Sequence, residues 1–125
     1  MATRPDGAEP AHELGRRGEE QAALELIRRG FEILDRNVRL RSAEVDLIAR
    51  DAAGLIFVEV KSRTTARYGY PYEAVSESKR ERLSQAALEY ISSQKLERTD
   101  FRIGVVSVIF APDGRLASLE WIDEA

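Results

Sequence analysis

The fold is decided by the stretch Leu55-Ile56-Phe57-Val58-Glu59-Val60-Lys61, a continuous apolar run that carries two charges. A run of this length and β-branched content predicts a central strand buried on both faces. A carboxylate and an ammonium inside such a strand are costly unless something compensates them. We therefore expect Glu59 and Lys61 to belong either to a local ion-pair network or to a chemical site.

Immediately upstream, the sequence predicts a hairpin. Residues 44–50 have the composition of a second strand, and residues 51–54 (Asp-Ala-Ala-Gly) have that of a turn. A four-residue loop over 51–54 makes Arg50 pair with Leu55, and the register of the two strands follows from that pair.

This register brings charged residues of the two strands together. Asp46 falls opposite Glu59, and Glu44 falls opposite Lys61, with all four side chains on one face because alternate residues of a strand point the same way. Opposed Cβ atoms lie about 4.5–5.5 Å apart. Two ionised carboxylates at about 4 Å repel by about 4 kcal/mol at an effective dielectric of about 20. A shared proton, the Lys61 ammonium or a divalent cation would relieve that repulsion.

Two interpretations of this cluster stay open on spacing alone. In the first, Asp46 and Glu59 bind Mg²⁺, which takes one or two protein carboxylates and fills its octahedron with waters and phosphate oxygens. A backbone carbonyl near Val60 supplies a further oxygen, and Lys61 orients the attacking water or neutralises charge on a scissile phosphate. In the second, Glu44 and Asp46 form an ion-pair network with Lys61 on a half-exposed sheet face.

The remaining elements complete an α/β domain with a mixed five-stranded sheet flanked by helices, in the order α-β-β-β-α-β-β. They are a helix over 13–29, a strand over 31–40, a helix from an N-cap at Ser76 to about residue 95, and strands over 101–110 and 115–122. Residues 1–12 are rich in Ala, Pro, Gly and charge and are expected to form a disordered tail, with His12 solvated at its edge. Residues 13–125 are expected to form a single domain.

Composition narrows the function classes. The 125 residues contain no cysteine and one histidine, which excludes disulfides and thiolate metal sites and is compatible with a cytoplasmic protein. No signal peptide and no membrane-length apolar run is visible. The net charge of −3 argues against a nucleic-acid partner. Residues 61–82, however, hold six basic side chains against three acidic ones, so the charge is polarised.

With Asp46 on one strand and Glu59-Val60-Lys61 on the next, the chain resembles the PD-(D/E)xK nuclease superfamily. More closely, it resembles the bacterial YraN-like family of predicted endonucleases, which is related to archaeal Holliday-junction resolvases. The matching residues are Gly18-Glu19, Arg36-Asn37, residues 44–48 and 57–63, Tyr68-Gly69, Lys79, and Arg102 before Val105-Val106.

The resemblance implies a restriction-endonuclease-like fold and hydrolysis of DNA phosphodiester bonds with Mg²⁺ or Mn²⁺. It implies metal binding by Asp46 and Glu59 and a catalytic role for Lys61. Glu19 matches a first-helix glutamate that joins the active site in resolvase-type members; alternatively, it is an exposed glutamate that favours the helix dipole. Branched or junction DNA is a possible substrate, and junction resolution would require two active sites and hence a homodimer.

Two departures from the family pattern bear on function. Ser42-Ala43 stands where the family usually has glycine before the Glu-x-Asp motif, and Gly104 replaces a common aspartate in the fourth strand. Together with the acidic net charge, Gly104 favours the alternative that the chain is a non-catalytic nucleic-acid-binding or interaction module on the same fold. The intact set of Asp46, Glu59 and Lys61 opposes that alternative.

Four further residues are candidates for contacts with nucleic acid. Arg63 and Arg67 flank a loop and suit phosphate contacts. Tyr68, with Tyr70 and Tyr72, either stacks on exposed bases or pins the loop to the domain surface. Lys79 either reaches the site or a phosphate, or is a surface lysine whose stem covers apolar surface.

Overall fold

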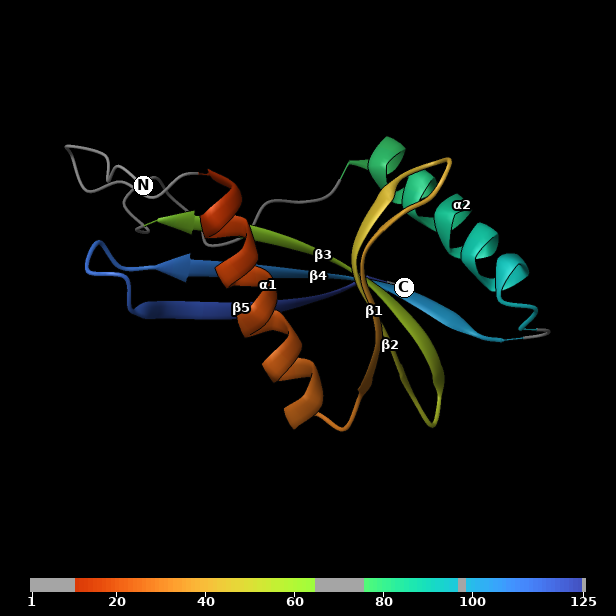
Figure 1. The fold of residues 1–125 in the computed structure, drawn as a ribbon, viewed down its shortest axis with the longest axis horizontal. Coiled ribbons are helices and arrows are strands. Elements are labelled where there is room, and N and C mark those ends of the chain that lie inside the picture. The colour runs from red at the N-terminus through yellow and green to blue at the C-terminus, as the bar shows by residue number, and fades with distance from the viewer. Residues whose placement is uncertain (1–10, 65–75, 97–98, 125) are drawn as a thin grey trace.

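The computed structural model describes residues 11–64, 76–96 and 99–124 as a five-stranded sheet with a helix on each face (Figure 1). The elements are α1 (Ala11–Arg28), β1 (Glu32–Arg39), β2 (Glu44–Asp51), β3 (Gly54–Thr64), α2 (Glu77–Ser93), β4 (Phe101–Phe110) and β5 (Leu116–Glu124). The strands lie in the order β1-β2-β3-β4-β5, and all neighbours are antiparallel except β3 and β4. The predicted element order and mixed sheet are confirmed.

The stretch that decides the fold is the middle strand of the sheet. Leu55, Ile56, Phe57 and Val58 of β3 are all buried. β3 pairs with β4 in parallel from Leu55↔Phe101 to Thr64↔Phe110, because α2 crosses over between the two strands.

Two apolar clusters, one on each face of the sheet, form the core. The cluster on the α1 face contains Ala22, Ala23, Leu26, Leu47, Ala49, Ile56, Val58, Val106, Val108 and Phe110. The cluster on the α2 face contains Val45, Ile48, Leu55, Phe57, Leu83, Ala86, Ala87, Tyr90 and Ile103. Neighbouring residues of β3 therefore alternate between the two faces, as a strand buried on both sides requires.

The helices begin close to their predicted positions. α1 starts at Ala11, so His12 lies in its first turn, where it is exposed; the rest of the expected N-terminal tail, residues 1–10, lies outside the described residues. α2 has the predicted N-cap, since Ser76 Oγ accepts the Lys79 amide at 3.0 Å. Neither helix is long and apolar enough to cross a membrane.

The β2–β3 hairpin has the predicted register but a tighter turn and a shorter ladder. Arg50 pairs with Leu55 as expected, and Asp51 also pairs with Gly54, which leaves a two-residue turn. At the other end the ladder stops at Leu47↔Val58. The expected direct pairs of Asp46 with Glu59 and of Glu44 with Lys61 are therefore absent from the ladder of these two fully described strands.

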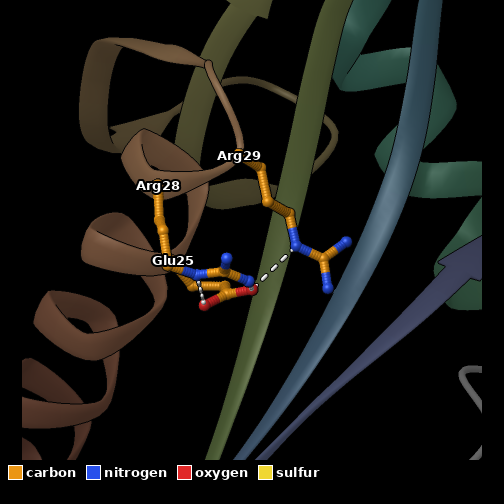
Figure 2. Close-up of polar contacts among 3 residues, drawn as sticks. All are labelled: Glu25, Arg28 and Arg29. Atoms are coloured by element: carbon orange, nitrogen blue, oxygen red, sulfur yellow. Dashed lines mark hydrogen bonds and ion pairs between the residues drawn. The ribbon is translucent and has the colours of Figure 1, made fainter.

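Polar contacts fasten both ends of α1 to the edge of the sheet. Near the start of the helix, the Arg17 guanidinium lies 4.2 Å from the Phe110 ring centroid and donates to the Gly114 carbonyl. At the end, Glu25 binds both Arg28 and Arg29 (Figure 2), and the Arg29 guanidinium lies 4.9 Å from the Trp121 ring centroid. Trp121 is partly buried and packs against the core cluster on the α1 face.

A glycine lets α1 approach β3 closely. A Cβ at Gly18 would lie 1.8 Å from Ser62 Oγ and 2.9 Å from Ser62 Cβ, whereas a Cβ at Gly15 in the same helix would meet nothing within 4 Å. The contact at Gly18 fixes the distance of the neighbouring Glu19 from the sheet.

We expect Gly18→Ala to lower the free energy of unfolding by about 1–3 kcal/mol, because the added methyl group forces α1 away from Ser62. The matched variant Gly15→Ala should leave stability unchanged or raise it by up to about 1 kcal/mol, as alanine favours a helix over glycine. Urea unfolding of both variants measures the difference. Equal stabilities would contradict the close helix–strand contact.

Candidate active site

The candidate site forms where β2 and β3 separate. Beyond Leu47↔Val58, β2 continues to pair with β1, and β3 continues to pair with β4. The Asp46 side chain enters the space between the two strands, and its Oδ2 accepts the backbone N–H of Val60 at 2.7 Å. The carboxylate thereby takes the place of the missing ladder partner and is held beside the Glu59-Val60-Lys61 segment.

Glu59 lies between the sheet and the start of α2. Its Oε2 is 3.4 Å from Nζ of Lys79, and only 14% of the Glu59 side chain is exposed, against 36% for Lys79. The N-cap at Ser76 places Lys79 in the first turn of α2, from which its side chain reaches the strand. The structure thus brings Lys79 to the site, in agreement with one of its two sequence interpretations.

Glu19 points inward from α1 and is half-buried. Burial is the main cause that raises its pKa, and the nearby carboxylates of Glu44 and Glu59 raise it further. A hydrogen bond from the Asn37 side chain opposes this shift. Asn37 adopts a left-handed backbone conformation, with φ of 51°, which asparagine tolerates better than most residues. The sequence identified Asn37 as part of a family match but gave it no role; the structure makes it the partner of Glu19.

Asp46 is the carboxyl group of the site whose pKa is shifted most strongly. Burial raises the pKa of its carboxyl group to about 7, and the carboxylates of Glu59, Glu19 and Glu44 add to the shift, while the Val60 amide opposes it. Acidic side chains from α1, β2 and β3 therefore converge near one point, although they are far apart in sequence. A cation placed there would stabilise all of them at once.

The predicted ion-pair network around Lys61 does not form among the described residues. Glu44 pairs with Arg39 at 3.7 Å, and Glu59 pairs with Lys79; neither Glu44 nor Asp46 forms an ion pair with Lys61. Lys61 is half-buried, lies in register with Ser107 of β4, and shares strand parity with Glu59. Its ammonium is thus not committed to neutralising the acidic residues of β2.

The oxygen atoms of the candidate site suit a hard cation that takes only part of its coordination shell from the protein. Asp46 and Glu59 supply carboxylate oxygens, and the Val60 carbonyl lies between Glu59 and Lys61 on the same strand. Within the described part of the chain, no group of three or more His, Cys, Asp or Glu side chains is arranged to hold a metal ion. Mg²⁺ needs fewer protein ligands, because it usually binds one or two carboxylates and completes its shell with water and phosphate oxygens.

The predicted nucleic-acid contacts are only partly described. Arg63 is half-buried near the end of β3 and shares strand parity with Glu59 and Lys61. Arg67 and Tyr68, together with Tyr70 and Tyr72, lie outside the described residues.

Gly104 points away from the acidic cluster. The nearest atoms to a Cβ built there belong to Ile56 at 3.1 Å and Trp121 at 3.5 Å, and Ile56 belongs to the core on the α1 face. Gly104 is the ladder partner of Val58, whereas Glu59 pairs with Val105. An aspartate at position 104 would therefore enter apolar surroundings, so the glycine removes no carboxylate from the site.

Comparisons with known proteins give consistent matches over most of the chain. The model of a family described as "Uncharacterised protein family UPF0102" matches residues 18–108. A UPF0102 protein of Symbiobacterium thermophilum is 48% identical over 103 residues, which cover 82% of this chain and 87% of that protein. A UPF0102 protein of Geobacter sulfurreducens is 45% identical over 101 residues, which cover 80% of this chain and 79% of that protein.

Among solved structures, the chain is similar to one described as a repair endonuclease from Pyrococcus abyssi. The TM-score is 0.36 and the sequence identity 17%, over 84% of this chain and 39% of that protein. A likeness at this level carries no argument about function.

We expect Asp46→Asn to stabilise the protein at alkaline pH. Because the folded-state pKa of Asp46 lies above its unfolded value, the stability linked to this group is complete below about pH 4 and is lost as the pH rises through about 7. Asparagine can still accept the Val60 N–H but carries no charge. Urea unfolding should show the variant equal to wild type near pH 4 and more stable by on the order of 2–4 kcal/mol at pH 8.

Glu25→Gln is the matched control with the opposite sign. Hydrogen bonds from Arg28 and Arg29 lower the pKa of Glu25 to about 2. Its contribution to stability is therefore present above the unfolded pKa of about 4.5 and is lost as the pH falls through about 2. The glutamine variant should be less stable than wild type at both pH 5 and pH 8. A destabilised Asp46→Asn at pH 8 would show that the charge on Asp46 is compensated in the free protein.

Proposed function

The chain belongs to the uncharacterised protein family UPF0102, and on that premise we propose that it is a metal-dependent endonuclease that hydrolyses phosphodiester bonds in DNA. The observation that carries the proposal is the half-buried Asp46 carboxylate, which accepts the Val60 amide at 2.7 Å and whose pKa is raised to about 7 beside Glu59, Glu19 and Glu44. Folding alone does not favour this arrangement, because burial and the neighbouring carboxylates raise the pKa of both Asp46 and Glu19. Strongly perturbed acids that gather at one point are typical of chemical sites.

The roles of the residues follow from their positions. Asp46 and Glu59 would hold Mg²⁺ or Mn²⁺, with the Val60 carbonyl as a further oxygen donor. When bound, such an ion polarises a phosphoryl oxygen and makes water more acidic. The half-buried Lys61 has the charge to stabilise the pentacovalent phosphate or to orient the attacking water, and it is not held by Glu44 or Asp46. Glu19, which accepts a hydrogen bond from Asn37, adds a third carboxyl group, and burial raises its pKa above the ordinary value.

Lys79 offers a second positive charge at the edge of the site. In the free protein its ammonium lies 3.4 Å from Glu59, where it offsets part of the acidic charge. Glu59 belongs both to this contact and to the proposed metal site, and the Lys79 ammonium has the charge to bind a phosphate of the substrate. From the family resemblance we further propose that the substrate is branched or junction DNA. Cleavage of a junction would require a homodimer with two such sites.

The alternative, a non-catalytic binding module on the same fold, has lost its main structural support. The argument for it was that Gly104 had replaced a carboxylate of the site, and position 104 instead faces Ile56 and Trp121. The acidic net charge of −3 remains in favour of this alternative.

We expect purified protein to cleave labelled DNA when Mg²⁺ or Mn²⁺ is present and not when EDTA is present. Linear, flapped and four-way-junction substrates would reveal the preference for branched DNA. Lys61→Ala should lower the cleavage rate by about 10²–10³-fold, because the charge that develops on the phosphate loses its partner. Arg115→Ala, in the turn between β4 and β5, removes an exposed positive charge that pairs with Asp113 and not with a residue of the site, and should cleave like wild type. Folded wild-type protein without metal-dependent cleavage would refute the nuclease assignment.

Isothermal titration with Mn²⁺ tests the metal ligands without any need for activity. We expect Asp46→Ala and Glu59→Ala to lose most of the binding, and Glu25→Gln to retain it. Binding should be weaker at pH 6 than at pH 8, because the ion must displace the proton that Asp46 holds at the lower pH. Lys79→Ala should bind Mn²⁺ at least as tightly as wild type, since its ammonium competes for Glu59. Unchanged affinity in Asp46→Ala would contradict the proposed ligand set.

A further inference from the structure

A groove lies between the β1–β2 turn and the N-terminal half of α2, next to the candidate active site. It has a volume of about 560 Å³ and is lined by Arg41, Ser42, Ser78, Glu81, Arg82 and Gln85. The volume is within the range of about 300–1,000 Å³ that is common for ligand sites. Such sites are usually lined by apolar side chains, whereas every described residue that lines this one is polar or charged. The groove therefore suits a hydrophilic ligand rather than a drug-like or lipid molecule.

One carboxylate joins the two segments that border the groove. Glu89 of α2 accepts the backbone N–H of Ser42 at 3.2 Å and its hydroxyl at 2.6 Å. These bonds, together with the nearby Arg41, lower the pKa of Glu89, so the fastening persists in mildly acidic solution. Glu89 thus ties the β1–β2 turn to the side of α2, and Figure 1 shows the two segments side by side.

The helical repeat places the groove residues in one line. Ser78, Arg82, Gln85 and Glu89 are spaced by four, three and four residues and therefore share one stripe of α2. Glu89 holds the turn at one end of the stripe. At the other end, Ser78 directly precedes Lys79, whose ammonium contacts Glu59. The groove lining and the candidate active site thus draw on consecutive residues in the first turn of α2.

Two guanidinium groups set the charge of the lining. Arg41 comes from the turn and Arg82 from the helix, against the single carboxylate of Glu81. Arg82 Nη1 donates to Ser78 Oγ at 2.9 Å, which uses one of its five N–H donors and steadies the group along the helix. Guanidinium pairs with further hydroxyl and amide donors bind phosphate oxygens well, because charge-assisted hydrogen bonds to them can be bidentate.

We infer that this groove binds the sugar–phosphate backbone of the nucleic-acid strand that leads to the active site, with Arg41 and Arg82 contacting its phosphates. The inference rests on the proposed function for its direction, because Ser78 of the lining directly precedes Lys79, whose ammonium contacts Glu59. It assigns the path of the substrate to the β1–β2 turn and α2. The lining carries two guanidinium groups against one carboxylate, so a chain with a net charge of −3 still offers a locally positive surface to a polyanion.

Fluorescence anisotropy of a labelled DNA duplex and a labelled four-way junction, in EDTA, tests the inference while cleavage is prevented. We expect Arg41→Ala and Arg82→Ala each to weaken binding by about three- to tenfold and to lower the slope of log Kd against log salt concentration by about one. The matched control Arg115→Ala also loses one arginine charge, from the turn that precedes β5 at the opposite edge of the sheet from β1, and should change neither quantity. Circular dichroism would confirm that all variants are folded.

A gain of affinity gives a test that misfolding cannot imitate. Glu81→Gln removes the negative charge that lines the groove and should tighten DNA binding, with a lower Kd at low salt. Glu120 is an exposed acid on β5. Glu120→Gln changes the net charge by the same amount and should leave the Kd for DNA unchanged. Inorganic phosphate at millimolar concentration should compete weakly, whereas unlabelled DNA should compete fully; full displacement by phosphate would instead indicate a site for a small anion and overturn the inference.

The outcomes separate this inference from the nuclease proposal. If Arg41→Ala, Arg82→Ala and Glu81→Gln all bind DNA as Arg115→Ala does, the groove is not the path of the strand, even if wild type cleaves DNA and Lys61→Ala does not. If the groove variants shift affinity as expected but no metal-dependent cleavage occurs, the groove binds nucleic acid and the nuclease proposal fails. Wild type that binds no DNA at low salt would overturn the groove assignment directly.

Discussion

The structure depends on a backbone donor that loses its strand partner. β3 stays paired with β4 through Thr64, but its ladder with β2 ends at Val58, so the amide of Val60 faces a gap. A buried N–H without an acceptor costs about 1–3 kcal/mol. The Asp46 carboxylate, at 2.7 Å, satisfies it. This single hydrogen bond fixes where β2 and β3 separate, and it places Asp46 beside Glu59 and within reach of the acidic residue that α1 brings to the same point.

This hydrogen bond alone does not offset the cost of ionising the Asp46 carboxyl group. One amide favours the ionised form, while burial and three neighbouring carboxylates disfavour it, and the pKa rises to about 7. Glu25 shows the contrast within the same chain, because two arginines at hydrogen-bond distance lower its pKa to about 2. The charge on Glu25, in the last turn of α1, is thus compensated by two arginines. The charge on Asp46, where α1, β2 and β3 meet, is compensated only in part. Such a local loss of stability is common where a site awaits a charged ligand.

The fold was largely predictable because its signals are local. The apolar run of β3, the turn after Arg50 and the Ser76 cap each specify their own element, and the parity of β3 correctly placed Glu59 and Lys61 on one face. The site was less predictable, because its key contacts arise where the regular ladder stops. Extrapolating the hairpin made Asp46 a cross-strand partner of Glu59, whereas strand separation turned it toward the Val60 amide. The partnership of Asn37 with Glu19 depends on a left-handed residue in β1, and no periodicity in the sequence indicates it.

The start of α2 links the acidic site to the groove beside it. An α-helix turns by about 100° per residue, so the packing of Leu83 and Ala86 against the sheet decides which way its other side chains face. With these residues in the core, Lys79 reaches Glu59, and Ser78 and Arg82 line the groove. The Ser76 cap decides only where the helix begins, and it keeps Lys79 within the first turn. The buried stripe of α2 therefore sets the relative positions of the positive charges near the carboxylates.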